Sequence, residues 1–241
     1  MPKLYTTRIT SISDKTIRKD TNYINVMTWH PRTSPHGSYY YELSPYYLKT
    51  DGASPNYIIP HNAIFENFWQ GSKLYKVVSD QTIYRHYSLR SPRYIDWQYT
   101  TLIGTEKHFS GGCITDNYFR WRTSLFECKR PIRYPQKYST PLFSVAFDNE
   151  GNEHRMGYIE ARKKLYVAEY LRLIKNLPIV ETLHEMFAEQ DLYIAEIDVP
   201  HNQLITVELL ERLLENPDKP FGHGLCVAWL LLDPTIYDKE W

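Results

Sequence analysis

The sequence predicts an α+β fold in which helices pack around a small central set of strands. Short strand-like segments separated by turn residues dominate the first half, and amphipathic helical patterns dominate the second half. Neither an internal repeat nor a linker interrupts the 241 residues. We therefore expect one mixed domain over residues 1–241, with a basic, aromatic-rich insertion around residues 85–140.

The first half of the chain alternates strand-like and turn-like segments. Short strands are expected at residues 9–12, 23–29 and 38–43, bounded by polar, Pro or Gly residues. An amphipathic helix is predicted at residues 65–78, with Asn62 as its N-cap. Residues 85–140 show neither helical nor alternating periodicity, so loops and short strands are expected there.

The second half is richer in helices. Residues 143–147 form an apolar strand candidate, and the polar run 148–153 turns out of it. A second strand is expected at residues 191–198, with carboxylates at its exit. Helices are predicted at residues 158–174, from Pro178 to residue 187, from a Thr206 cap to residue 214, and at residues 225–232.

Composition excludes several classes of protein. The three cysteines, Cys113, Cys128 and Cys226, lie far apart, which argues against a disulfide framework or a structural zinc site. No metal-ligand cluster or Gly-rich phosphate loop stands out, so no metal and no cofactor are expected. The chain lacks an apolar run of 18 residues and an apolar leader. We expect a cytoplasmic protein with no membrane partner.

Charge is unevenly distributed although the net charge is zero. Residues 85–137 contain ten Lys or Arg against four acids, and residues 181–241 contain thirteen acids against three bases. The two regions either attract each other within the fold or form a phosphate-attracting and a repelling face. Arg120-Trp121-Arg122 and residues 129–134 alternate basic and planar groups, a pattern typical of single-strand binders, or use their arginines for internal hydrogen bonds.

Three polar residues form a row on the predicted helix 65–78. Offsets of four and seven residues place Glu66, Gln70 and Lys73 within about 60° of one another. Trp69 and Phe65 flank this row. A carboxylate, an amide and an ammonium edged by aromatic rings suit a sugar and its phosphates, whereas the alternative interpretation is a solvated helix face.

This row resembles the signature helix of the NADAR fold family, the YbiA-like N-glycosidases. That helix carries a glutamate, a glutamine four residues later and a lysine seven residues later, as Glu66, Gln70 and Lys73 do here. A short Ser/aromatic segment precedes the helix in the family, and Leu43-Ser44-Pro45-Tyr46 is similar to it.

Later segments extend the resemblance. In the family a strand ends in an acidic residue, here Glu196 or Asp198, and a glycine-containing turn, here around His223, leads into an apolar helix. The family's amphipathic helix with a basic residue facing the ligand is matched by Arg162, Lys163 and Tyr166.

The chain departs from the family pattern in two places. Val199-Pro200-His201 replaces the usual aromatic-glycine pair after the acidic strand, and the basic middle is longer than the family core. Some chains of large viruses and phages share this extended arrangement, which favours such a source and, with it, the host cytoplasm.

The resemblance implies hydrolysis of a ribose–nitrogen bond in an ADP-ribosyl or phosphoribosyl conjugate. Positive charge builds on the ribose as this bond breaks, so a carboxylate beside the anomeric carbon stabilises the transition state or activates water. Glu66 is the first catalytic candidate, and Glu196 or Asp198 is the second carboxylate.

The remaining candidates are expected to bind substrate. Lys73 and Arg162 would neutralise phosphates, while Gln70 and Ser44 would hold ribose hydroxyls. Tyr166 belongs to the same set.

Three candidates, Trp69, Asp198 and His223, have ordinary structural alternatives. Trp69 or Tyr46 would stack on a base, but Trp69 is equally typical of a core. Asp198 also suits a turn before Pro200. His223 either contacts substrate or caps the helix that follows it.

Two further functions compete with the glycosidase. The first is a non-catalytic protein that sequesters a nucleotide or ADP-ribose. The second is a nucleic-acid-associated protein that uses the basic, aromatic residues 85–137. The expected partner is accordingly a small nucleotide or ADP-ribosylated substrate, with nucleic acid as the alternative, and the oligomeric state stays open.

Overall fold

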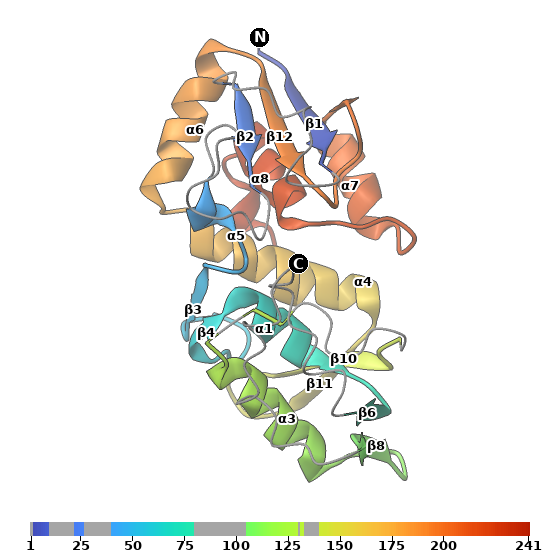
Figure 1. Cartoon of the computed structure of the whole chain (residues 1–241). Helices are drawn as coiled ribbons and strands as arrows, with labels where there is room; N and C mark the ends of the chain where they lie inside the picture. The colour runs from blue at the N-terminus through green and yellow to red at the C-terminus, as the bar shows by residue number, and fades with distance from the viewer. Residues whose placement is uncertain (1, 10–21, 27–39, 80–104, 130, 133–139) are drawn as a thin grey trace, which may run out of the picture. The chain divides into compact units, whose positions relative to one another are not determined.

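The computed structural model describes residues 2–9, 22–26, 40–79, 105–129, 131–132 and 140–241 (Figure 1). The chain divides into two compact units, and each is treated by itself. Unit 1 comprises Met1–Leu48 and Arg162–Trp241, and unit 2 comprises Lys49–Ala161. Both units contain helices and strands, so the α+β class predicted from the sequence is confirmed.

Unit 1 is built on a four-stranded sheet with the order β13-β1-β12-β2. The strands are β1 (Leu4–Arg8), β2 (Tyr23–Asn25), β12 (Leu192–Glu196) and β13 (Gln203–Leu204). β12 pairs in parallel with β1 and β2, and β13 runs antiparallel to β1. The register aligns Tyr5, Tyr193 and Tyr23, whose rings stack at 5.0 and 4.9 Å between centroids.

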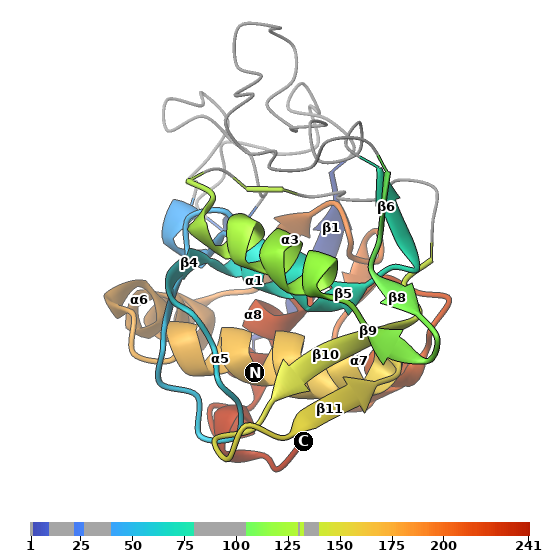
Figure 2. The ribbon, with the colours of Figure 1, turned by 90° about the horizontal axis from the view of Figure 1, so that it is seen from below.

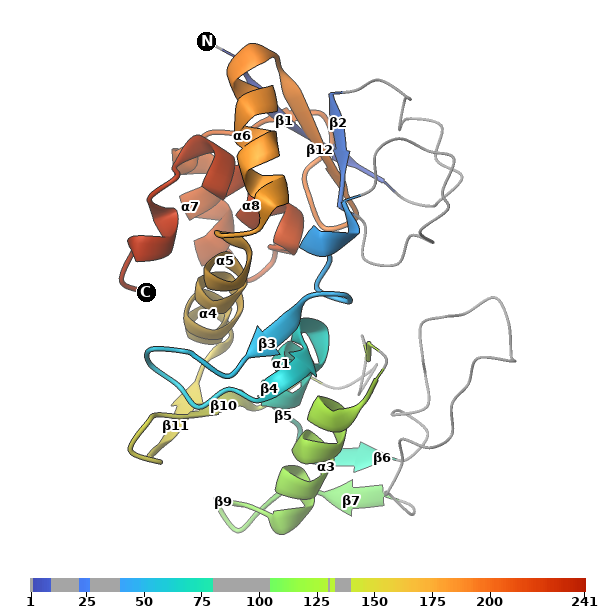
Figure 3. The same cartoon turned by 90° about the vertical axis from the view of Figure 1, so that its left-hand side faces the viewer.

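Helices of unit 1 pack on this sheet through α8 (His223–Leu232), which contacts β12 as well as α5, α6 and α7. Figure 3 shows α6, α7 and α8 on one side of the sheet. Nine of the ten α8 residues, from His223 to Leu231, are buried, which explains why its sequence is apolar on every face. The other helical segments are η1 (Tyr41–Leu43), the π-helical η4 (Arg162–Val167), α5 (Ala168–Ile174), α6 (Pro178–Glu189), α7 (Val207–Glu215) and η5 (Ile236–Asp238).

Unit 2 places α1 (Phe65–Ser72) beside α3 (Asp116–Glu127), as Figure 2 shows. A three-stranded sheet has the order β11-β10-β5, and three two-stranded sheets pair β3 with β4, β6 with β7, and β8 with β9. The remaining elements are β3 (Lys49–Asp51), β4 (His61–Ile64), β5 (Lys73–Leu74), β6 (Val77–Ser79), β7 (Thr105–Lys107), β8 (Phe109–Ser110), β9 (Cys113–Ile114), β10 (Phe143–Phe147), β11 (Glu153–Met156) and α4 (Tyr158–Ala161). A core cluster includes Leu74, Tyr75, Val78, Tyr118, Trp121, Leu125 and Val145.

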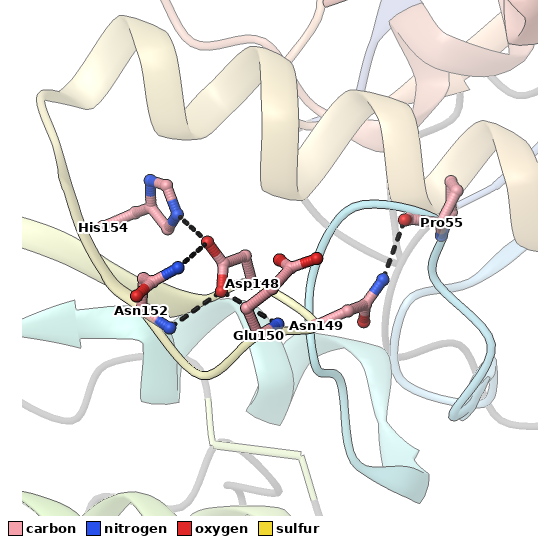
Figure 4. Close-up of polar contacts among 6 residues, drawn as sticks. All are labelled: Pro55, Asp148, Asn149, Glu150, Asn152 and His154. Carbon is pink, nitrogen blue, oxygen red and sulfur yellow. Dashed lines mark hydrogen bonds and ion pairs between the residues drawn. The ribbon is translucent and has the colours of Figure 1, made fainter.

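The hairpin between β10 and β11 is closed by one carboxylate (Figure 4). Asp148 accepts hydrogen bonds from the Glu150 amide at 3.1 Å, from the amide and side chain of Asn152 at 2.7 and 3.0 Å, and from His154 Nε2 at 2.9 Å. The hydrogen bond from His154, followed by that from Asn152, holds the pKa of Asp148 far below its ordinary value. Gly151, with φ of 86°, supplies the left-handed residue that the turn requires.

The helix predicted at residues 65–78 is shorter than expected. It ends at Ser72 because Lys73 and Leu74 join the sheet, where they pair with Ser144 and Phe143 of β10. Asn62 does not cap it, since the N-cap is Ile64 and Asn62 lies within β4 at a left-handed φ of 62°. A competing tertiary pairing therefore ends the helix where local periodicity continues.

Three further boundaries differ from the sequence prediction. The region 85–140, expected to lack a helix, contains α3 after an extended Thr115. Residues 41–43, expected in a strand, form the 3-10 turn η1. The first strand lies at Leu4–Arg8, and only Ile9 of the expected 9–12 strand is described, its amide bonding the carbonyl of Glu196 at 3.0 Å. Residues 27–29 of the second expected strand lie outside the described residues.

The predicted elements of the second half are confirmed. The strand at 143–147, the helix that starts at Pro178 and the strand inside 191–198 are all present. Thr206 caps α7, and its hydroxyl accepts a hydrogen bond from the Leu209 amide at 3.2 Å. The helical stretch 158–174 is present with the π-helical segment η4 at its centre.

Candidate functional site

Helix α1 is tied firmly into unit 2 by polar contacts. The buried Asn67 donates to the carbonyl of Cys128 at 3.3 Å and accepts from the amide of Ile132 at 2.7 Å. The Tyr118 hydroxyl lies 3.0 and 3.2 Å from the carbonyl oxygens of Gly71 and Ser72, which belong to the last turn of the helix. All eight residues of α1 are buried. Its side chains are therefore held in fixed positions.

The three polar residues of the row form a hydrogen-bonded chain. The Gln70 side-chain amide donates to Glu66 Oε1 at 2.8 Å, and the Lys73 ammonium donates to Gln70 Oε1 at 2.9 Å. Glu66 and Gln70 are each only 7% exposed. The interpretation of this row as a solvated helix face is therefore wrong. A buried carboxylate, amide and ammonium are costly to desolvate, and mutual hydrogen bonds offset that cost.

Lys73 stands at the end of this chain, against an aromatic ring. Its Nζ lies 4.5 Å from the centroid of Trp69, a cation–π distance. Burial lowers the pKa of the Lys73 ammonium from 10.5 to about 8, and the nearby Glu66 carboxylate offsets part of that fall. Trp69 itself is only 8% exposed, and the Lys73 ammonium lies over its ring.

A second group of candidates lies in unit 1, where β12 ends. Glu196 is 2% exposed, and its Oε1 lies 3.8 Å from Nδ1 of the equally buried His223. His223 Nε2 donates to the carbonyl of Val26. A Cβ added to Gly222 would lie 2.5 Å from Glu196 Oε2 and 3.1 Å from the Cβ of Asp198. Glycine at position 222 therefore makes room for the carboxylate at the start of α8.

Two residues near Glu196 were not among the sequence-predicted site residues. The buried Tyr170 donates its hydroxyl to the carbonyl of Leu43 at 2.5 Å, and Cys226 is fully buried. Burial raises the pKa of both groups well above its ordinary value, and the Glu196 charge adds to this. Both therefore stay protonated at neutral pH, which excludes Cys226 as a ready thiolate nucleophile. Neither Tyr170 nor Cys226 belongs to a sequence motif from which its place near Glu196 could have been predicted.

Arg162 has a different environment from the phosphate site expected for it. Its guanidinium is 1% exposed and donates to four carbonyl oxygens after and at the end of α7. The acceptors are Leu213 at 3.2 Å, Leu214 at 3.1 Å, Asn216 at 3.0 Å and Lys219 at 3.0 Å. The assignment of Arg162 to substrate phosphates is thus corrected to a cap on the C-terminal end of α7.

Other predicted binding residues also have partners within unit 1. Tyr166 is 6% exposed and stacks on Tyr170 at 6.3 Å between centroids. Ser44 is fully buried, and its hydroxyl accepts from the amide of Tyr46 at 3.3 Å, closing a turn. Lys163 forms an ion pair with Glu215. The structure brings Glu66, Trp69, Gln70 and Lys73 together in unit 2, and Glu196, Asp198 and His223 together in unit 1.

The basic, aromatic middle is only partly described. Arg120 is exposed at 66% of its side chain, 2.6 Å from Asn117 and 3.7 Å from Glu106. Arg122 is buried, with its guanidinium 5.2 Å from the Phe126 ring centroid. Residues 80–104, 130 and 133–139 lie outside the described residues. Of the Arg120/Arg122 pair, only Arg120 presents its charge to solvent.

Among the described residues, no group of three or more His, Cys, Asp or Glu side chains is arranged to hold a metal ion. Within the same part of the chain, no helix is long and apolar enough to cross a membrane.

Comparison with known proteins gives no relatives. The chain matches no protein-family model, no curated protein and no solved structure. The site must therefore be interpreted from its own geometry.

Proposed function

We propose that the protein is an N-glycosidase that hydrolyses a ribose–nitrogen bond in an ADP-ribosyl or phosphoribosyl conjugate, with Glu66 as the catalytic carboxylate. The observation that carries this proposal is the hydrogen-bonded chain from Glu66 through Gln70 to Lys73. A carboxylate that is 7% exposed and held by a neighbouring amide is preorganised, so it need not reorient as charge develops on the substrate.

The reaction requires a negatively charged group beside the ribose carbon on which positive charge develops. As the bond between the anomeric carbon and nitrogen breaks, positive charge spreads over C1 and the ring oxygen of the ribose. Glu66 stabilises that charge and accepts a proton from the attacking water. The water oxygen bonds to the anomeric carbon, and the departing nitrogen leaves with the bonding electron pair and takes up a proton from solvent.

Gln70 and Lys73 support this carboxylate. Gln70 donates one amide hydrogen to Glu66 and keeps a second for a ribose hydroxyl. The Lys73 ammonium donates one N–H to Gln70 and has two more N–H groups that can donate to a phosphate oxygen. Because the pKa of Lys73 is about 8, its charge and any phosphate affinity that depends on it weaken above that pH.

The decisive experiment replaces Glu66 by Gln in the full chain. Turnover of ADP-ribosyl and phosphoribosyl conjugates, including NAD, is followed by chromatography of the released base and sugar. We expect Glu66→Gln to lower kcat by about 100-fold or more with little change in affinity, because the amide keeps the shape and loses the charge. Glu127→Gln, on an exposed position at the end of α3, is the matched control and should keep wild-type turnover.

Wild-type turnover by Glu66→Gln would reject Glu66 as the catalyst. No turnover of any conjugate by the wild-type protein would reject the glycosidase and leave the second candidate. That candidate is a protein that binds a nucleotide or ADP-ribose without cleaving it, and it is favoured by the remaining donors of Gln70 and Lys73, which suit a ribose and a phosphate whether or not a bond is cleaved. Thermal-shift measurements with ADP-ribose and NAD separate the two, since a binder is stabilised while no product forms.

A further inference from the structure

The segment after α8, at the acidic end of the chain, contains none of the residues considered for the glycosidase chemistry. Residues 181–241 contain thirteen acids and three bases, and Lys239 is one of those bases. In unit 1 the segment after α8 returns past α7 and brings Lys239 next to Glu211. Among the described residues, the surroundings of this lysine form a cluster of aromatic and charged groups that the proposed glycosidase does not use.

Two tryptophan rings and one carboxylate surround the Lys239 ammonium. Its Nζ lies 5.3 Å from the ring centroid of Trp229 and 5.3 Å from that of Trp241. The two rings are perpendicular, at 90° with centroids 5.6 Å apart, so they form two walls of a corner. Glu211 Oε1 accepts from Nζ at 3.1 Å and closes a third side. This is the arrangement of an aromatic cage for an ammonium ion.

Lys239 also borders two surface hollows. One has a volume of about 300 Å³ and is bordered by both tryptophans, and the other has a volume of about 340 Å³ and is bordered by Trp229 and η5. Glu211, Trp229 and Lys239 line both hollows. The lysine side chain therefore borders both hollows, and its movement outward would leave the corner of the two rings open to a ligand.

The charge around the hollows favours a cation. Their linings contain five acids and two lysines, so the local balance is −3. The acids are Glu211, Glu215, Asp233, Asp238 and Glu240, and the lysines are Lys163 and Lys239. Lys163 is paired with Glu215, and Lys239 is paired with Glu211. A phosphate or carboxylate ligand would be repelled here, whereas an organic cation would replace the charge that a displaced Lys239 takes away.

We propose that Trp229, Trp241 and Glu211 form a binding site for a small organic ammonium ion, and that Lys239 of the same chain competes for this site. A methylated ammonium suits the site better than a simple amine, because it is more weakly hydrated and gives up less hydration when it packs on two aromatic faces. Lys239 is tethered close to the cage at a high effective concentration, so it weakens the apparent affinity of the ligand.

The test is a titration with tetramethylammonium chloride, followed by tryptophan fluorescence and by the indole N–H signals in NMR spectra of the full chain. Ionic strength is held constant with sodium chloride. We expect Lys239→Ala to lower the Kd for tetramethylammonium at least about fivefold relative to wild type, because the competing ammonium is removed. Adding Trp241→Ala to this variant should weaken binding at least about tenfold, because one wall of the cage is lost.

Two controls make the result specific. Lys175→Ala removes another lysine that rests on an aromatic ring in unit 1, with Nζ 4.4 Å from the centroid of Tyr237, and it should leave the affinity for tetramethylammonium unchanged. The neutral tert-butyl alcohol has a similar size and should bind far more weakly than the cation.

Four results would overturn the proposal. These are a Kd for Lys239→Ala that equals or exceeds the wild-type value, binding that survives the loss of Trp241, equal binding of tert-butyl alcohol, and an equal gain from Lys175→Ala. None of these results depends on glycosidase turnover, so this proposal and the proposed function fail independently.

Discussion

Replacing Arg162 by Met should destabilise unit 1 severely. The guanidinium is 1% exposed and donates to four carbonyl oxygens at 3.0 to 3.2 Å. Met fills much of the volume but leaves those carbonyl groups without their donor. A hydrogen bond from a charged group is worth about 1.5–3 kcal/mol, and bonds that share one side chain are not additive. We therefore expect the free energy of unfolding to fall by about 4 kcal/mol.

The neighbouring Lys163 offers a matched control. Its ammonium pairs with Glu215, whose side chain is 59% exposed, and such surface pairs contribute about 1 kcal/mol or less. Urea unfolding at 25 °C is followed by circular dichroism and tryptophan fluorescence. We expect the free energy of unfolding of Arg162→Met to be far lower than that of Lys163→Met or of the wild type. The free energy of unfolding of Arg162→Lys should lie between those of Arg162→Met and the wild type. Lysine keeps the charge, but it lacks the planar fork of N–H donors that reaches all four carbonyl groups.

The capping role of Arg162 would be refuted if Arg162→Met lowered the free energy of unfolding by less than about 1.5 kcal/mol, or by no more than Lys163→Met does. A phosphate ligand at Arg162 would give the opposite pattern. In that case the free energy of unfolding would be kept and the affinity for ADP-ribose would fall. The two measurements on one variant thus distinguish a helix cap from a substrate-binding residue.

Three more predictions concern stability. Burial among aromatic rings lowers the pKa of His108 from 6.5 to about 4, and neither ring nitrogen has a hydrogen-bond partner among the described residues. As the pH falls from 6.5 to 4, His108 is protonated in the unfolded state while it stays neutral in the folded state. The free energy of unfolding should therefore drop by about 3 kcal/mol over that window, and His108→Phe should flatten this pH dependence. Gly222→Ala places a Cβ 2.5 Å from Glu196 Oε2 and should lower the free energy of unfolding by about 2 kcal/mol. The control Gly157→Ala meets nothing within 4 Å and should lower it by less than about 1 kcal/mol, both measured by urea unfolding. Asn67→Ala removes two buried hydrogen bonds and should lower the thermal midpoint by the equivalent of about 2–3 kcal/mol, and a loss below about 0.5 kcal/mol would contradict the role of Asn67 in holding α1.

Local chemistry made much of the secondary structure predictable. Pro178 can start a helix because its missing N–H needs no partner, and Thr206 supplies a side-chain acceptor to a free amide, so both helix starts were found from the sequence. The apolar run of α8 indicated a buried helix for a similar reason, because apolar residues on every face leave no side for water. The polar turn 148–153 followed from its Asp, Asn and Gly residues.

Pairings between distant segments were not predictable. The helix at residues 65–78 stops at Ser72 because β10, about 70 residues further along, offers backbone partners to Lys73 and Leu74. Helix α3 was missed because only four of its residues are buried, so its apolar stripe is narrow and interrupted by charges.

The candidate site divides in the same way. By itself the sequence determined that Glu66 and Gln70 lie on one side of a helix, because helical spacing is a local property; Lys73 follows the helix as the first residue of β5 and reaches Gln70 from there. Only the tertiary structure decided that this side is buried, that Arg162 donates to carbonyl groups at the end of α7, and that the Lys239 ammonium lies against two tryptophan rings. Burial and partner choice depend on which remote residues arrive at a position, and no pattern within one segment contains that information.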